Sequence, residues 1–427
     1  MTALLLISLF VIFSALGLPL AFCMGITATA GLLFSGFGSP AVAAQRIFAG
    51  MNSYALLALP LFLLAGNILV AGGVINRLVV FADLLVGRVR GGLAQVNVLS
   101  NLMMAGVSGS ATADTAALGS VMVPMMSARG YAPTFAAALT TSAGIVAPIL
   151  PPSLIMVIYA IPTRISIGAL FLAGVVPALL MSAAFMAYVR YACRHHPLSE
   201  KRESAQGLAR ATIHALPVLM APVLLVGGIR GGVFTATEAA AVLVAYALAL
   251  TMVLHRSLKL SELVGILHDS ALTTASIMLM IGTSSIFAWY LAIEDVPQAT
   301  RALLDAATDN RYVFLLIVNV FLLLVGCVLD TVPAILIFVP ILQPAAVAFG
   351  IDPVHFAIIV IVNLMVGVNT PPIGTNLLVI SGIAGLRVGS VTRALLPFYA
   401  VKVAALMVIT YVPFISLWLP RYLGFGP

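Results

Sequence analysis

Two groups of polar side chains that can bind a cation lie within long apolar stretches of the sequence. In the first group, Ser108, Ser110 and Thr112 supply hydroxyl groups, and Asp114 follows them; the second and sparser group contains Asp330. A sodium ion is bound by several oxygens with little net charge, which hydroxyls and free carbonyls provide. Acidic side chains in apolar surroundings are costly and usually functional. The pattern predicts two cation-binding segments, and tight packing of the small residues and helix capping by the aspartates remain open as alternative or additional roles.

The composition identifies the elements around these segments as membrane helices. Of the 427 residues, 62% are apolar and 8% are charged, and the mean hydropathy is +1.19. Continuous apolar runs recur, in place of the alternation typical of β-barrel strands. Residues 1–36 are apolar, lack a signal-peptide cleavage site and are long enough for two short spans. The net charge of +7 is spread through loops, which indicates topology rather than nucleic-acid binding, and the three cysteines lack metal-ligand spacing.

The two Pro-Pro pairs of the sequence, Pro151-Pro152 and Pro371-Pro372, are predicted to break helices at membrane depth. Proline has no backbone donor and clashes with the preceding turn, so carbonyl groups are left unpaired. Lipid cannot satisfy these carbonyls, and unwound backbone is tolerated only where it faces protein or a wet cavity. The polar residues beside both pairs favour a binding site over a simple kink. We therefore expect segments 147–153 and 366–376 to form two halves of one site.

Internal repetition predicts two halves of opposite orientation. An offset of 216 residues matches Asp114 with Asp330, and an offset of 220 matches the Pro-Pro pairs. The basic segment 190–210 is placed in the cytoplasm, and the chain then crosses the membrane an odd number of times between equivalent points of the two halves. Two full crossings in place of the first hairpin fit the charges equally well. We predict an all-α integral membrane protein with inverted repeats, about ten transmembrane helices and two re-entrant hairpins. The predicted divisions are a first repeat at 1–190 with a hairpin at about 93–128 and a broken helix at about 133–160, a cytoplasmic linker at 191–212, and a second repeat at 213–427 with a hairpin at about 312–349 and a broken helix at about 355–386.

Five longer motifs occur in the order Gly50–Asn67, Ser108–Asp114, Pro148–Ser153, Phe234–Ala241 and Asn369–Gly374. Together they resemble the large membrane subunit of TRAP transporters, the tripartite ATP-independent periplasmic carriers, over nearly the whole chain. The resemblance implies a sodium-coupled importer of organic acids in the bacterial inner membrane, with a hairpin-bearing transport domain that moves as an elevator against a scaffold. It also implies two partners, a periplasmic substrate-binding protein and a separate small four-helix membrane subunit. Membrane lipid surrounds such a chain, and no cofactor is expected besides sodium as the coupling ion.

The resemblance also implies where the ligands bind, with a sodium site between each hairpin tip and the broken helix of the same repeat. The first site then consists of Ser108, Gly109, Ser110, Thr112, Pro148 and Pro151. The second consists of Gly326, Asp330, Thr331, Gly367, Val368, Asn369 and Thr370. The organic acid is expected between the tips, near Ser110, Asp114, Asn369, Thr370 and Asn376. Helix N-termini there offer positive ends to a carboxylate, whereas neither tip contains Arg or Lys, so the residue that binds the carboxylate stays open.

Other classes of function have less support from the sequence. A stand-alone sodium:organic anion symporter would share the hairpins but need no partners, and the motifs at 50–67 and 235–241 argue against it. An intramembrane enzyme is disfavoured because none of the six histidines pairs with a cysteine or an acid in a metal or triad spacing. A channel would need polar rings from an oligomer. Glu238 is expected to cap the helix that follows it, which is a structural role.

Overall fold

The computed structural model describes residues 2–35, 39–194 and 205–425, and every regular element in these ranges is a helix. Eight helices of this described part are long and apolar enough to cross a membrane, and four further apolar helices are shorter. The prediction of an all-α membrane protein is therefore confirmed. The predicted linker at 191–212 falls largely on residues 195–204, which lie outside the described ranges.

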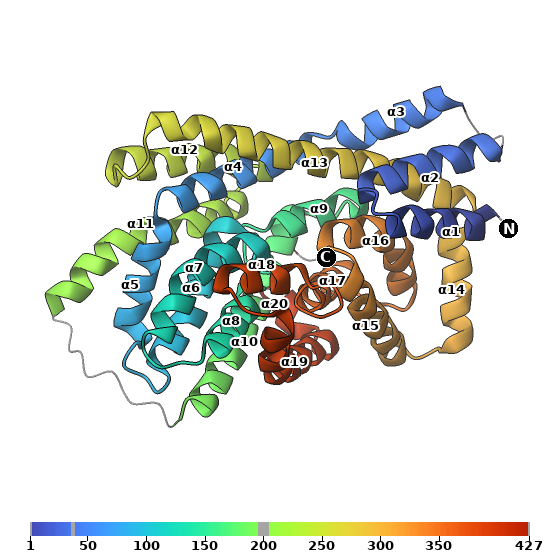
Figure 1. The fold of residues 1–427 in the computed structure, drawn as a ribbon. Helices are drawn as coiled ribbons and strands as arrows, with labels where there is room; N and C mark the ends of the chain where they lie inside the picture. The colour runs from blue at the N-terminus through green and yellow to red at the C-terminus, as the bar shows by residue number, and fades with distance from the viewer. Residues whose placement is uncertain (1, 36–38, 195–204, 426–427) are drawn as a thin grey trace.

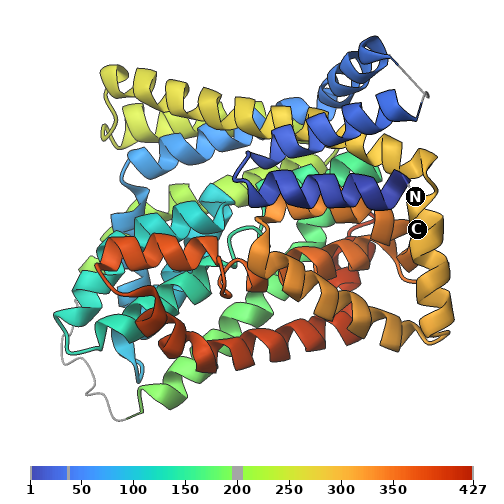
Figure 2. The same ribbon diagram turned by 45° about the vertical axis from the view of Figure 1, so that its right-hand side comes forward.

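One layer of long helices runs along one side of the molecule, at the top of Figures 1 and 2. Within it, α13 packs against α2, α3 and α4, and α4 packs against α12. We call this layer the scaffold layer. Its elements are α1 (Thr2–Ala15), α2 (Leu20–Phe34), α3 (Pro40–Met51), η1 (Tyr54–Leu57), α4 (Ala58–Ala71), α12 (Ala236–Leu248) with η2 (Ala249–Leu254), and α13 (Leu260–Ile293). Three helices descend from the layer or connect it to the rest: α5 (Val74–Val86), α11 (Ala205–Arg230) and α14 (Val296–Ala307).

The remaining helices form a body below this layer, built from two sets in the same order (Figure 1). Each set has a helical hairpin, a broken helix and one long helix. The first set is α6 (Gly92–Ser108), α7 (Ala111–Ser127), α8 (Pro133–Gly144), α9 (Leu154–Thr163) and α10 (Ile167–Ala192). The second is α15 (Arg311–Val328), α16 (Thr331–Ala348), α17 (Pro353–Gly367), α18 (Thr375–Ala384) and α19 (Val388–Tyr411), followed by α20 (Phe414–Tyr422). The sets interleave, because α18 packs on α7 and α9 packs on α16.

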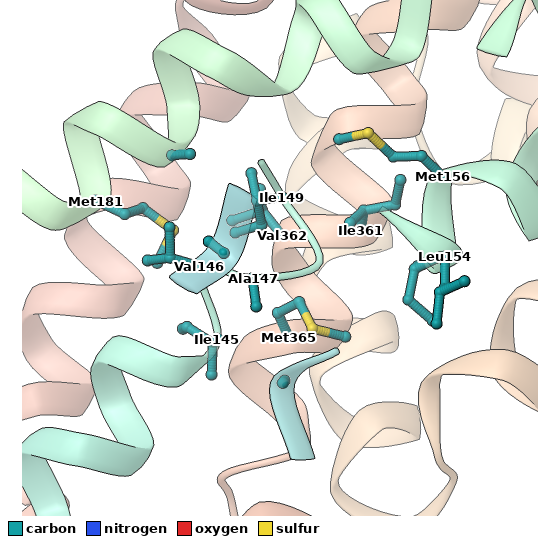
Figure 3. Close-up of a cluster of buried hydrophobic side chains, with 14 of the residues drawn as sticks. Ile145, Val146, Ala147, Ile149, Leu154, Met156, Met181, Ile361, Val362 and Met365 are labelled. Atoms are coloured by element: carbon teal, nitrogen blue, oxygen red, sulfur yellow. The ribbon is translucent and has the colours of Figure 1, made fainter. Parts of the chain in front are cut away.

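The backbone leaves helical geometry at both Pro-Pro pairs, whose internal peptide bonds are cis. The first break, 145–153, is embedded in protein. Ile145, Val146 and Ile149 are buried, and Figure 3 shows this segment packed beside Ile361 and Met365 of α17. Lipid does not reach these side chains, which is the condition under which a membrane protein tolerates unwound backbone. The second break is different, because Pro371 to Ile373 are exposed.

Two capping interactions expected from the sequence have different outcomes. Glu238 forms the expected capping box: its carboxylate accepts from Thr235 N at 2.8 Å, and Thr235 Oγ1 accepts from Glu238 N at 3.3 Å. The capping alternative for Asp114 is wrong, because Ser110 caps α7 by accepting from Ala113 N. Ser110 is the N-cap because its backbone is extended at the point where the helix begins, which is the geometry of an N-cap residue.

Candidate binding site

A cavity of about 300 Å³ lies where the two hairpin tips, the two helix breaks and α13 meet. Its only charged lining residue among those described is Asp330, and none is basic. The polar part of its lining comes from both halves of the body and from the scaffold layer: Ser110, Thr112, Thr273, Ser276, Asp330, Thr331, Thr375 and Asn376. Apolar side chains such as Leu63, Ile155 and Met280 supply most of the remaining wall.

The first turns of four helices line this single cavity. α7 and α16 begin at the hairpin tips, and α9 and α18 begin just after the breaks. Each helix N-terminus carries a partial positive charge from its free N–H groups, which favours an anion although no described lining residue is basic; the carboxylate of Asp330 opposes this at the start of α16. In three of the four helices the side chain of the N-cap residue accepts a hydrogen bond from the first turn: Ser110 caps α7, Ser153 caps α9, and Asp330 caps α16. α18 starts at Gly374, which has no side chain to cap it.

The first hairpin tip is held against the first break. Gly109 has φ +62°, and a Cβ added to it would lie 2.3 Å from the carbonyl oxygen of Pro152. Glycine is therefore required twice, for the left-handed backbone and for the close approach. Ser108 Oγ donates to the carboxylate of Asp114, and Ser110 and Thr112 share a hydrogen bond of 3.2 Å between their hydroxyls. The tip is thus a network of short polar side chains on tightly packed backbone.

Oxygen atoms without hydrogen-bond partners gather at the C-terminal end of α8. A Cβ added to Gly144 would lie 2.6 Å from Thr115 Oγ1, 3.5 Å from the carbonyl oxygen of Ala111 and 3.6 Å from Asn101 Oδ1. The side-chain oxygens of Thr115 and Asn101 are buried and have no partner within the described residues, and neither has the second carboxylate oxygen of Asp114. Buried unpaired oxygens at the negative end of a helix are suited to a cation. Sequence reasoning did not single out Asn101 or Thr115 as ligands.

The second hairpin also contacts the break of its own half. Gly326 of α15 faces Gly367 at the end of α17, where a Cβ added to Gly367 would lie 2.6 Å from the Cα of Gly326. Ile373 N donates to the carbonyl oxygen of Cys327 at 3.2 Å, which ties the break to the hairpin. Asp330 caps α16 through a 2.8 Å bond from Thr331 N, so its expected capping role is observed.

Asn369 joins the two halves of the body. Its Nδ2 donates to the carbonyl oxygen of Thr141 at 2.8 Å, and Thr141 Oγ1 donates to its Oδ1 at 3.2 Å. The carbonyl oxygen of Asn369 accepts from the hydroxyl of Tyr399, and Thr370 Oγ1 donates to the carbonyl oxygen of Val366 in the last turn of α17. The side chain of Asn369 is therefore engaged in the contact between α8 and the second break.

Several polar atoms around the cavity have no partner. Asn376 is fully buried, and both its Oδ1 and its Nδ2 lack hydrogen bonds to the described residues. The hydroxyls of Thr331 and Thr375 are likewise unpaired. Buried polar atoms are nearly always hydrogen-bonded in native proteins, so unsatisfied donors that line a cavity indicate a ligand or water. All three residues belong to the second half.

Comparison with known proteins assigns the family. Residues 6–415 match the family described as "Tripartite ATP-independent periplasmic transporter, DctM component". The chain belongs to this family. The predicted resemblance to the TRAP large subunit is thereby confirmed, and this DctM component is a multi-pass protein of the bacterial inner membrane.

Two relatives and one solved structure illustrate the likeness. The chain is 37% identical over 416 residues to the sialic acid TRAP transporter large permease SiaM of Vibrio cholerae, and the aligned region covers 96% of each chain. It is 39% identical over 382 residues to the C4-dicarboxylate TRAP transporter large permease DctM of Pseudomonas aeruginosa, covering 89% of this chain and 90% of that protein. The fold is similar to the crystal structure of the Alcanivorax borkumensis YdaH transporter, with a TM-score of 0.61 and 14% identity over 89% of each chain.

The residues predicted to bind ligands in this DctM component separate into two groups. Seven of them line the cavity: Ser110, Thr112, Pro148, Asp330, Thr331, Val368 and Asn376. The others do not line it: Ser108, Gly109, Asp114, Pro151, Gly326, Gly367, Asn369 and Thr370. Of the predicted substrate residues, only Ser110 and Asn376 line the cavity; one carboxylate oxygen of Asp114 accepts from Ser108, and Asn369 and Thr370 are hydrogen-bonded within the body.

Proposed function

We propose that this DctM component imports an organic acid by sodium-coupled transport, with the carboxylate bound in the cavity between the two tips. The observation that carries the proposal is the meeting of four helix N-termini at one cavity without a basic side chain. Such a site attracts a carboxylate through backbone N–H groups. The relatives named for sialic acid and for C4-dicarboxylates are transporters of carboxylates, which supports the substrate class.

The unpaired oxygens behind the tips support a cation as the coupling ion. The unpaired side-chain oxygens of Asn101 and Thr115 converge beside Gly144 with the carbonyl oxygen of Ala111, and all three groups are neutral. Neutral oxygens in several directions are the environment that a monovalent cation requires. We assign this cluster, together with Asp114, to the first sodium site. The second site is assigned to the equivalent region between Gly326 and Thr370, where α15 and the end of α17 touch.

The position of the cavity supports an elevator mechanism. Its walls belong to the body except on the side of the scaffold layer, where α4 contributes Leu63 and α13 contributes Ile277, Met280 and the two hydroxyl groups of Thr273 and Ser276. Both hydroxyls donate to carbonyls of α13 itself, at 2.9 and 3.0 Å. The α13 wall therefore offers no free hydroxyl donor that could bind the substrate to the scaffold layer. A substrate held by the body alone can move with it along the scaffold layer.

The partners of the transporter follow from the family. A TRAP transporter has a periplasmic substrate-binding protein and a small membrane subunit besides the DctM component, and we propose both as partners of this chain. Exposed apolar side chains along the scaffold layer, among them Ile26, Leu260 and Leu272, provide a face that lipid or the small subunit can cover. The alternative is a sodium:organic anion symporter that acts without a binding protein.

Uptake into proteoliposomes tests the proposal directly. The chain is reconstituted with its small subunit, and uptake of radiolabelled sialic acid and succinate is measured with and without a sodium gradient and with and without the cognate binding protein. We expect uptake only when both sodium and the binding protein are present. Uptake that ignores the binding protein would establish the stand-alone symporter, and uptake without sodium would refute the coupling.

A further inference from the structure

A second cavity, of about 650 Å³, opens between α11 and the end of α12. It shares no lining residue with the cavity proposed for the substrate. Its lining consists of Pro217 of α11, Tyr246 of α12, four apolar side chains of η2, and Arg256. We call it the α11–α12 groove. Val253 and Leu254, two of the η2 side chains, are exposed, so the groove is open at the surface of the protein.

Two departures from regular α-helix shape the groove. Pro217 has no N–H, so the carbonyl of Ile213 loses its helical donor and α11 is weakened at that point. η2 is a π-helix, in which His255 N donates to the carbonyl oxygen of Leu250, five residues earlier, at 2.9 Å. Such segments are rare and frequently occur at functional sites. Tyr246 bridges the two helices, because its hydroxyl donates to the carbonyl oxygen of Pro217 at 2.6 Å.

The turn after η2 places a positive charge at the groove. Arg256 is exposed and has φ +50°, a left-handed conformation that residues other than glycine seldom adopt. The turn is held on both sides: Ser257 N donates to the carbonyl oxygen of Thr251 at 2.8 Å, and Ser257 Oγ donates to the carbonyl oxygen of Gly72 at 2.7 Å. Backbone held in such a conformation is concentrated at ligand sites and switches.

No acidic side chain in the described ranges pairs with Arg256, which takes part in none of the three ion pairs observed there. α11 and η2 contain no aspartate or glutamate, and Glu262 accepts from Lys259 N at the start of α13. Both ring nitrogens of His255 are buried without a partner among the described residues, and its ring lies 6.4 Å from that of His214 on α11. The groove therefore combines apolar walls with an unneutralised cation and an unsatisfied imidazole.

The groove faces lipid at one surface of the membrane. α11 and the joined α12 and η2 are consecutive candidate spans, and the contact of His214 with His255 places the start of the first beside the end of the second, at the left of Figure 1. α11 follows the basic segment 190–210, which we expect in the cytoplasm. Residues 211–230 are the least buried of the eight candidate spans in the described ranges, with 22% of the apolar window buried. The groove thus extends from the expected cytoplasmic surface into the bilayer.

We propose that the α11–α12 groove binds one anionic phospholipid of the cytoplasmic leaflet, with its phosphate at Arg256 and an acyl chain along Leu250 and Leu254. Arginine binds phosphate through two parallel hydrogen bonds, and basic pockets between membrane helices on the cytoplasmic side suit such headgroups. A headgroup with hydroxyls, such as phosphatidylglycerol, has both an acceptor and a donor to offer the imidazole of His255. An apolar helix of the small subunit would leave the charge of Arg256 without an anion. This inference does not depend on the substrate or on the coupling ion.

Photocrosslinking with a labelled lipid tests this. The chain and its small subunit are reconstituted in phosphatidylcholine nanodiscs with a trace of phosphatidylglycerol that carries a diazirine in one acyl chain, and the crosslinked peptides are mapped by mass spectrometry. We expect crosslinks within residues 217–254 that unlabelled phosphatidylglycerol removes and inorganic phosphate does not. Arg256→Gln should reduce them about fivefold, the effect of one basic residue at a membrane surface. Arg256→Lys keeps the charge and should keep most of the crosslinks.

Matched variants separate the headgroup from the apolar wall. Arg230→Gln removes an exposed arginine at the opposite end of α11 and should change nothing. Ala249→Trp fills the groove and should abolish the crosslinks, whereas Ala241→Trp adds the same ring at an exposed position of α12 outside the groove and should keep them.

Four results would overturn the inference. Unchanged crosslinks in both Arg256→Gln and Ala249→Trp would place the lipid elsewhere, and an equal loss in Arg230→Gln would show a general effect of charge. Removal of the crosslinks by added inorganic phosphate would indicate a simple anion site. Crosslinks that appear only when the small subunit is omitted would make the groove a contact between subunits.

Discussion

Replacing Asn376 by leucine separates the binding of substrate from the stability of the fold. Both polar atoms of the Asn376 side chain are buried and unpaired, so in the substrate-free protein they cost about 1–3 kcal/mol in lost hydration. Leucine has a similar size and no polar atoms, so the free energy of unfolding of the Asn376→Leu variant should be higher than that of the wild type by about that amount. A hydrogen bond from Nδ2 to a carboxylate contributes about 1.5–3 kcal/mol, so its loss should weaken substrate binding about 10- to 100-fold.

Thermal unfolding and uptake kinetics together measure both effects. The Asn376→Leu variant should unfold at a higher temperature without substrate and show a raised KM for the organic acid. Asn363→Leu is the matched control, because Asn363 is also buried but lies outside the cavity and donates to the carbonyl oxygen of Asn319 at 2.9 Å. That variant should lose stability and keep the wild-type KM. An Asn376→Leu variant with wild-type KM would refute a hydrogen bond from Asn376 to the substrate carboxylate.

Three further substitutions test the tips and breaks. Asp114→Ala leaves Ser108 without its acceptor and removes the one acidic group of the first tip. Sodium-dependent uptake should therefore disappear, while surface labelling should still find the chain in the membrane. Uptake with normal sodium dependence would exclude Asp114 from the first site. Gly367→Ala forces a methyl group to within 2.6 Å of the Cα of Gly326 and should cost about 1–3 kcal/mol of stability and weaken sodium binding; unchanged unfolding and unchanged sodium titrations would contradict the close contact. Replacement of Pro371 and Pro372 by alanines restores two backbone donors and should let α17 and α18 join, with loss of sodium-dependent uptake; full uptake in that variant would show that the break is not needed.

The sequence predicted the helix breaks and the tips because their causes are local. A Pro-Pro pair interrupts a helix wherever it occurs, and α8 and α17 both end shortly before such a pair. Ser153 and Asp330 are typical N-cap residues, and both cap the helices that follow them. The family resemblance added the order of the elements, which local patterns alone do not determine.

The polar contacts behind the tips could not be predicted from local patterns, because they depend on which helix faces meet. Thr141 and Asn369 are 228 residues apart, and they pair only because α8 lies beside the second break. For the first cation site one signal was present. Asn97 and Asn101 are spaced four residues apart on one face of an apolar helix, and Asn101 Nδ2 donates to Asn97 Oδ1 at 2.8 Å. An amide pair at that spacing in a membrane helix is reason to search for a polar partner across the helix.

The repetition of the sequence suggests two equivalent halves, yet the four helix starts at the cavity are not equivalent. α7, α9 and α16 each donate an N–H group to their own cap residue. α18 has no side-chain cap at Gly374; in its first turn the backbone N–H of Asn376 donates to the carbonyl oxygen of Val368 at 3.2 Å, and the side chain of Asn376 is unpaired. An anion gains most where donors are free, since it replaces no existing hydrogen bond. We therefore expect the first carboxylate of a substrate to bind at α18. A second polar group would meet the hydroxyls of Ser110 and Thr112 across the cavity, and those two residues should control which organic acids are accepted.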